Sequence, residues 1–109
     1  KAEAEFRRAV GLLGQGRGSE ADESFAAAIA IDPAHEASRQ ALVALRLEGR
    51  RIEDARRLLQ EGLAINPANV QFATVLARIL AERRDYVHAL EAMQGAAGAS
   101  AAGNADYQV

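Results

Sequence analysis

The residues that could do chemistry in this chain are few and widely spaced. Its two histidines, His35 and His88, stand far apart, and the sequence contains no cysteine. A zinc site needs several His, Cys or carboxylate ligands at short spacings, and neither histidine has a second histidine or a cysteine at such a spacing. The sequence therefore predicts no metal site, no cofactor and no disulfide, and it places both histidines on the surface or in turns.

The glycine and acidic clusters do not indicate catalysis either. Gly14, Gly16 and Gly18 resemble a phosphate loop, but such a loop follows a strand and opens a helix, whereas these glycines join two predicted helices. Acidic pairs such as Glu53 and Asp54 stand at predicted helix starts, where they favour the helix dipole and do not face each other. We therefore predict no catalytic residue and no enzymatic activity.

Three pairs of arginines are predicted to lie on solvated faces and in turns. These pairs are Arg50–Arg51, Arg56–Arg57 and Arg83–Arg84, and an alternative makes Arg50, Arg51 and Arg84 a patch for an anionic partner. The net charge is only −2, with acids and bases interspersed and five aromatic residues in all. Nucleic-acid binding needs a basic field and often aromatic stacking platforms, so no nucleic-acid partner is expected.

The composition predicts an all-helical chain of about one domain. Half of the 109 residues are apolar, and 26 of them are alanine, the strongest helix former. No run of β-branched residues alternates with period two. The longest uninterrupted apolar stretch is the seven residues 25–31, which is too short to span a membrane.

A 34-residue repeat organises these helices. The segment 31–34 (Ile-Asp-Pro-Ala) returns at 65–68 as Ile-Asn-Pro-Ala, and 34 residues is the length of one helix-turn-helix unit. The second helix of each unit has a small, a large apolar and a small residue at spacings of four and three, which predicts a packing face. These trios are Ala21, Phe25 and Ala28; Ala55, Leu59 and Gly62; and Ala89, Met93 and Ala96. Asp32 and Asn66 are predicted N-caps, and Pro33 and Pro67 the first helical residues.

The alanine, large-residue, small-residue and proline positions resemble the tetratricopeptide repeat family. The resemblance implies an all-α, right-handed α-solenoid of antiparallel helix pairs, at about 1–33, 34–67 and 68–101. Residues 102–109 are then the start of a truncated fourth repeat or a terminal tail. The sequence departs from the family at the large-aromatic position of each first helix, where it has Glu5, Arg39 and Ala73, and at Ala101, where proline is expected.

The C-terminal end is predicted to be open to another packing partner. The register places Tyr107 at the first large-aromatic position of a fourth repeat. Leu90, Met93 and Ala97 are expected to face a neighbour, because a solenoid otherwise needs a polar cap on its last helix. We therefore expect either that the natural protein continues beyond Val109 or that this end packs against another copy, as a homodimer.

The family resemblance also implies a concave groove lined by the first helices. Such a groove binds an amphipathic helix or an extended segment of a protein partner. The alternative is that Val10, Leu13 and Leu47 are simply core residues. Chaperone-binding members hold a terminal carboxylate at places that here carry Phe6, Val10 and Ala44, which cannot donate such bonds. The predicted groove residues are Phe6, Arg7, Val10, Leu13, Gln40, Ala41, Ala44, Leu47, Thr74, Val75, Arg78 and Glu82.

A protein-interaction scaffold is therefore the predicted function. Segments 32–42 and 65–68, with the closing residues 105–108, also resemble bacterial type IV pilus-assembly proteins of the mannose-sensitive haemagglutinin group. That resemblance implies a place at the periplasmic face of the inner membrane; otherwise a cytoplasmic location is expected. The alternatives are the regulatory repeat arm of a larger enzyme, such as a glycosyltransferase, and a self-assembly module.

Overall fold

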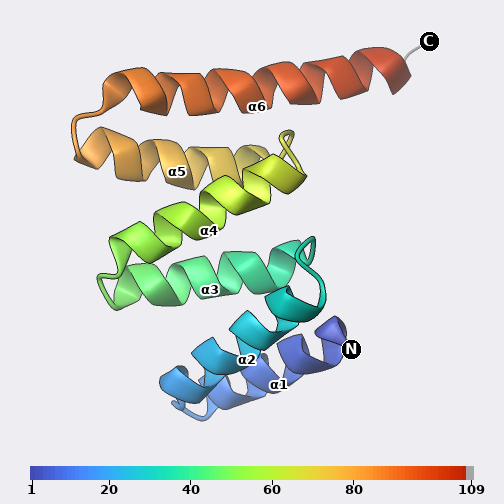
Figure 1. Cartoon of the computed structure of the whole chain (residues 1–109), viewed down its shortest axis with the longest axis vertical. Coiled ribbons are helices and arrows are strands. Elements are labelled where there is room, and N and C mark those ends of the chain that lie inside the picture. Colours follow the sequence, from blue (N-terminus) through green and yellow to red (C-terminus); the bar gives the residue numbers. More distant parts are fainter. Residues whose placement is uncertain (108–109) are drawn as a thin grey trace. The chain divides into compact units, whose positions relative to one another are not determined.

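The predicted all-α fold is confirmed by the computed structural model, which describes the backbone of residues 1–107 and the side chains of residues 1–101. Six helices and no strand occur within that range (Figure 1). The helices are α1 (Ala2–Gly14), α2 (Gly18–Ile31), α3 (Glu36–Glu48), α4 (Ile52–Ile65), α5 (Val70–Glu82) and α6 (Tyr86–Tyr107).

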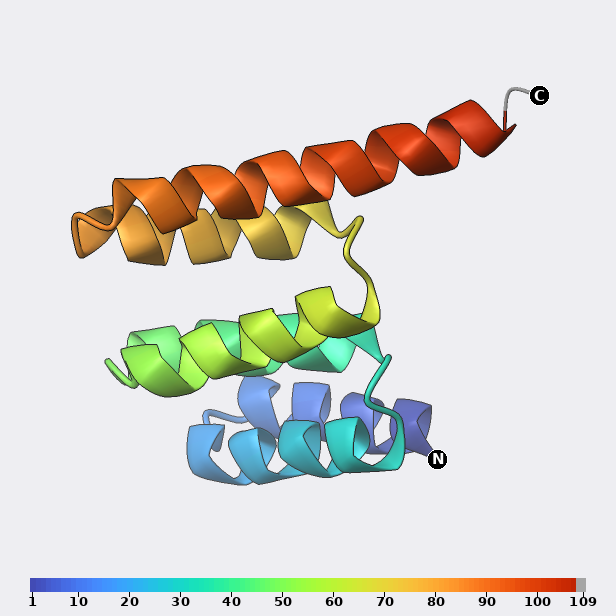
Figure 2. The ribbon, with the colours of Figure 1, turned by 45° about the horizontal axis from the view of Figure 1, so that its top comes forward.

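The helices form two compact units, Lys1–Leu58 and Leu59–Val109, whose boundary lies inside α4. In the first unit α1 packs against α2, and α2 packs against α3. In the second unit α5 lies along α6, as Figure 2 shows.

The small residues of the second helices lie where neighbouring helices come close. Ala21 and Ala55 are fully buried and Ala89 is 8 % exposed, which confirms the packing face that the repeat predicts. Phe25 and Leu59 fill the large position and are each 1 % exposed. A buried aromatic or leucine side chain stabilises the fold by about 1.5–3 kcal/mol relative to an exposed one. The equivalent Met93 is only half-buried.

Each unit has its own buried residues. In the first unit, Phe25 packs with Ala9, Ala21 and Leu42, and partly buried apolar residues surround these four. In the second unit, α5 supplies most of the buried side chains, and α6 supplies only alanines. The buried residues of α5 and α6 are Phe72, Ala73, Leu76, Ile79, Leu80, Ala89 and Ala96.

The turn inside each helix pair has a residue with a left-handed backbone conformation at the same position of the repeat. Gly16, Arg50 and Arg84 have φ angles of 76°, 61° and 63°. At the first turn the Gly16 amide donates to the Leu13 carbonyl (3.0 Å), and the Arg17 amide donates to the Leu12 carbonyl (2.9 Å). This bond pattern is the Schellman motif, which favours glycine at the left-handed residue. The same two bonds recur around Arg50 and Arg84.

The left-handed arginines predict an unusual stabilising substitution. A side chain with Cβ is strained at positive φ, so Arg50→Gly should raise the free energy of unfolding by about 0.5–1 kcal/mol. The reciprocal change Gly16→Arg in the equivalent turn should lower it by a similar amount. Urea unfolding of both variants measures the two effects, and a loss of stability in Arg50→Gly would contradict the strain.

The helix N-caps differ from the sequence prediction. Asp32 and Asn66 were expected to cap α3 and α5, but the caps are His35 and Asn69, three residues later. Asp32 and Asn66 instead accept hydrogen bonds from the amides of Ala34 (3.1 Å) and Ala68 (3.3 Å). Each proline lies within one of these short Asx turns, before the helix begins, so neither proline is the first helical residue.

Helix α6 continues through Ala101 to Tyr107 as one helix of 22 residues. Ala101 stands where the family has a helix-ending proline, and alanine keeps the amide that continues the helix. The side chain of Tyr107 and the whole of residues 108–109 lie outside the described residues. The start of a fourth repeat in 102–109 therefore stays a prediction.

Candidate protein-binding site

The predicted groove residues of the first unit lie on one face each of α1 and α3. On α1, Val10 and Leu13 are 48 % and 43 % exposed, so the alternative that both are core residues does not hold for them. On α3, Gln40 and Ala44 are exposed and Leu47 is half-buried. We call these five residues the α1–α3 face. It carries apolar side chains about one turn apart, as helix-binding surfaces do.

Phe6 and Arg7 flank the α1–α3 face toward the start of α1. The Phe6 ring is half-buried, and its centroid lies 5.8 Å from that of Phe25 and 5.4 Å from that of His35. Phe6 therefore contributes to the packing of the unit and presents only part of its ring to solvent. Arg7 is exposed and forms an ion pair of 3.5 Å with Glu3. Ala41 is partly buried against the core of the first unit.

The remaining predicted groove residues lie on α5, in the second unit. Thr74 is exposed, and its hydroxyl donates to the Val70 carbonyl at 2.7 Å. Arg78 and Glu82 are exposed, whereas Val75 is half-buried. The α5 residues thus form a mostly polar surface of the second unit. The apolar side chains of the predicted groove are concentrated in the first unit.

His35 joins the starts of α1 and α3. Its Nδ1 accepts the Ser38 amide at 3.3 Å and lies 2.8 Å from the Ser38 hydroxyl, and its Nε2 lies 2.9 Å from a Glu3 carboxylate oxygen. Since Nδ1 accepts from an amide, the network places the ring proton on Nε2, which donates to Glu3. Ser38 is fully buried, so this acid–histidine–serine row caps a helix and exposes no nucleophile. His35 lies in a turn, as predicted.

The contact between Glu3 and His35 predicts a pH dependence of stability. The hydrogen bond from His35 is the largest cause that lowers the pKa of Glu3; desolvation opposes it, and the charges of Arg7 and His35 lower the pKa further. Because the folded pKa is the lower one, this contact stabilises the fold above the unfolded pKa of about 4.3 and is lost as pH falls through the folded value.

We therefore expect Glu3→Gln to unfold with a shallower loss of stability than the wild type as the pH falls from about 5 to about 3. Urea titrations at a series of pH values measure the slope. Glu5→Gln is the control, because it makes the same substitution on the same helix and leaves the bond between Glu3 and His35 in place. Equal slopes in wild type and Glu3→Gln would remove the proposed role of this contact.

Arg39 is a buried cation that the sequence marked only as a departure from the family. It stands at the large-aromatic position of α3, is 2 % exposed and is the largest fully buried side chain in the described residues. Its guanidinium donates to the carbonyls of Pro33 (2.9 Å) and Leu58 (3.1 Å). Buried polar groups are tolerated when they are hydrogen-bonded, so Arg39 ties α3 to the preceding turn and to α4.

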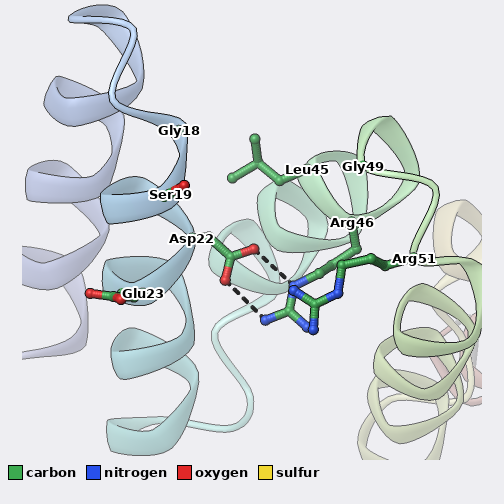
Figure 3. A pocket seen from close by; sticks show the side chains of 8 residues that line it. All are labelled: Gly18, Ser19, Asp22, Glu23, Leu45, Arg46, Gly49 and Arg51. Carbon is green, nitrogen blue, oxygen red and sulfur yellow. Dashed lines mark hydrogen bonds and ion pairs between the residues drawn. The ribbon is translucent and has the colours of Figure 1, made fainter.

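A second arginine, Arg46, occupies a position that is leucine in the other repeats. It donates to both carboxylate oxygens of Asp22 on α2 (2.8 and 3.0 Å) and to Asp54 on α4 (3.2 Å). Figure 3 shows the forked bond to Asp22 beside a pocket of about 380 Å³. The bond to Asp22 is the main cause that raises the pKa of Arg46, which therefore stays charged. Arg51 also binds Asp54 (2.6 Å).

The Arg46 network predicts strong coupling between its members. Arg46→Leu, which restores the residue of the equivalent positions, should cost about 2 kcal/mol because it leaves the partly buried Asp22 carboxylate without its cation, whereas Asp54 keeps its ion pair with Arg51. Adding Asp22→Ala to that variant should cost much less than Asp22→Ala alone. Urea unfolding of the four proteins gives the coupling energy, and strictly additive effects would contradict it.

The described residues contain no group of three or more His, Cys, Asp or Glu side chains that could hold a metal ion. His88 is exposed and its Nδ1 lies 2.7 Å from Asp85, in the turn before α6. No helix in the described part of the chain is long and apolar enough to cross a membrane.

The sequence profile of the tetratricopeptide repeat matches residues 12–79, which is more than half of the chain. The chain belongs to the tetratricopeptide repeat family. The match includes the Schellman turns at Gly16 and Arg50 and the helices between them. Comparison with curated proteins found no match. The narrower resemblance to pilus-assembly proteins of the mannose-sensitive haemagglutinin group thus gains no support from this comparison.

Solved structures with a similar fold include three kinds of tetratricopeptide protein. MamA has a TM-score of 0.79 and 12 % identity over 95 % of this chain, which spans only 61 % of the MamA chain. The type III secretion translocator chaperone SycD of Yersinia enterocolitica has a TM-score of 0.73 and 17 % identity, covering 90 % of this chain and 73 % of SycD.

The third is the second tetratricopeptide domain of Spaghetti (RPAP3), bound to the HSP90 peptide SRMEEVD. It has a TM-score of 0.71 and 16 % identity, covering 87 % of this chain and 88 % of that domain. At these identities the likeness shows the fold alone. The partners of these proteins are therefore not assigned to this chain.

Proposed function

We propose that this chain is a protein-interaction module that binds an amphipathic helix or an extended segment of a partner protein on its α1–α3 face. The observation that carries the proposal is the exposure of Val10 and Leu13, two large aliphatic side chains one turn apart on the first helix. Their burial by a partner would contribute about 25 cal/mol of binding free energy per Å² of apolar surface removed from water.

The surroundings of Val10 and Leu13 indicate the chemistry of the partner. Ala44 and Leu47 extend the apolar character on α3, and Gln40 offers an amide at its edge. Exposed Arg7 carries the charge nearest to this face on α1. The partner segment should therefore present two or three apolar anchors about one turn apart, with an acidic or polar flank. A small surface of this kind suits an affinity near 1 μM, about −8 kcal/mol.

A free C-terminal carboxylate is not the proposed anchor. The RPAP3 domain is bound to a peptide that ends in aspartate. In this chain the places that match the carboxylate-holding residues of chaperone-binding members carry Phe6, Val10 and Ala44, none of which has a polar side-chain donor. Recognition through apolar side chains of the partner follows from that difference.

The test compares the proteins captured by two matched double variants. Val10→Asp with Leu13→Asp should weaken binding of partners of this face at least about tenfold, because it removes two apolar anchors and desolvates two carboxylates. Quantitative pull-down from cells of the source organism, followed by titration of each captured protein, measures the loss. Phe6 is left unchanged, since its ring packs on Phe25 and its removal would also affect folding.

Ala4→Asp with Gly11→Asp is the control pair. Both positions are exposed on α1 but lie on another side of the helix, and a Cβ at Gly11 meets no atom within 4 Å. The control adds the same two charges and should bind like the wild type. Equal affinity of all three proteins for every captured partner would place the binding site elsewhere.

Two narrower roles can be proposed for this module. A part in bacterial pilus biogenesis rests on the short segments 32–42, 65–68 and 105–108. A part as the regulatory arm of a larger enzyme, such as a glycosyltransferase, would have its chemistry in another domain. Both are compatible with a binding surface on α1 and α3.

A further inference from the structure

The outer face of α6 carries an exposed apolar stripe that has no partner among the described residues. Tyr86, Val87 and Leu90 are 63 %, 67 % and 58 % exposed, which are the three highest values among the exposed large apolar residues of the chain. At 3.6 residues per turn they share an arc of about 120° with four further exposed positions. These are Gln94, Ala97, Gly98 and Ala101. We call the seven residues the α6 stripe.

The equivalent surface of α2 shows what such a stripe does in this fold. The seven equivalent residues lie two repeats, or 68 positions, earlier. Asp22, Ala26 and Ile29, equivalent to Leu90, Gln94 and Ala97, are partly buried, as is Gly18, whereas Ser19, Ala30 and Pro33 are exposed. Ala26 and Ile29 pack around a core cluster that contains Leu42 of α3, and Asp22 binds Arg46 of α3. On α2, therefore, the next helix covers the part of this side that contains Asp22, Ala26 and Ile29. On α6 the equivalent Leu90, Gln94 and Ala97 are exposed among the described residues.

The α6 stripe is complementary to itself when one copy is turned end to end. Its N-terminal half has the large side chains Tyr86, Val87 and Leu90, and its C-terminal half has only the small residues Ala97, Gly98 and Ala101. In an antiparallel pair the large half of one helix lies on the small half of the other, where small side chains allow helices to approach to about 8 Å. The large side chains of each copy then pack against the small residues of its partner.

The charges of α6 favour the same arrangement. No Asp, Glu, Lys or Arg occurs between Ala92 and Ala105, and none of the seven stripe residues is charged. A two-fold axis near Gln94 places Val87 opposite Ala101 and Leu90 opposite Gly98. It also brings the two Gln94 amides together, and an amide can both donate to and accept from its copy. Glu91 then faces the region of Ala97, so no like charges meet.

We propose that two copies of this chain associate through the α6 stripe as an antiparallel, two-fold helix pair centred near Gln94. The stripe is about 24 Å long at 1.5 Å per residue, so the interface lies at the small end of protein interfaces. A two-fold interface is closed, which limits assembly to a dimer rather than a filament. The α6 stripe shares no residue with the α1–α3 face, so partner binding and self-association can be tested with separate variants.

Sedimentation velocity from about 1 μM to about 500 μM measures the association, a range that includes the affinity expected of a small interface. The wild type should shift from monomer to dimer across it. Leu90→Asp should raise the dissociation constant at least about 100-fold, because a two-fold pair loses the contact twice. Gly95→Asp adds the same charge on another side of α6, where a Cβ meets no atom within 4 Å, and should dimerise like the wild type.

Cysteine crosslinking tests the orientation, since the natural chain has no cysteine. Gln94→Cys should form a disulfide-linked dimer on mild oxidation. Val87→Cys and Ala101→Cys should crosslink when mixed but not alone, because two copies of either position lie about 20 Å apart in the antiparallel pair, beyond disulfide reach.

Two results would overturn the proposal. One is a wild type that stays monomeric at every concentration. If, in addition, Leu90→Asp lowers the capture of a different protein, the α6 stripe is the binding site of that protein. The other is self-crosslinking of Val87→Cys with no crosslink between positions 87 and 101 in the mixture, which would mean a parallel pair. Circular dichroism melting of each variant verifies that the α6 changes leave the monomer folded.

Discussion

The close approach of neighbouring helices through small side chains is the constraint on which the other features of this chain depend. Ala21, Ala55 and Ala89 recur every 34 residues, and each is almost completely shielded from solvent. A larger residue there would move the adjoining helix away and open gaps that a well-packed interior does not tolerate. The large residue four positions later can be Phe25 or Leu59, because it fills whatever space the alanines leave.

Two arginines show how directional bonds work alongside this apolar packing. Arg39 and Arg46 both stand where the repeat has an apolar residue, and each reaches groups of other helices within its unit. Apolar contact is not directional, whereas a guanidinium fork accepts partners only in fixed positions. The two arginines therefore help to specify which helices pack on α3, at the expense of desolvating a charge.

The repeat period was enough to predict six helices, their pairing and their buried small residues. This was possible because the spacing of small and large apolar residues along each helix determines which of its faces packs. The caps were predicted wrongly, because both prolines lie in Asx turns and the true caps, His35 and Asn69, follow three residues later. The partners of Arg46 were not predictable, since Asp22 is 24 residues away and only the fold brings it near. Exposure of Val10 and Leu13 likewise required the structure, since their apolar nature alone also fitted a core.

The bond between Glu3 and His35 has a mechanical consequence. It joins residues 32 positions apart, and Glu3 lies in the first turn of the first helix. Separating the start of α1 from the rest of its unit therefore has to break this bond as well as the packing of α1 on α2. The first helix is thus held at both of its ends, by this bond at one and by the tight turn at Gly16 at the other.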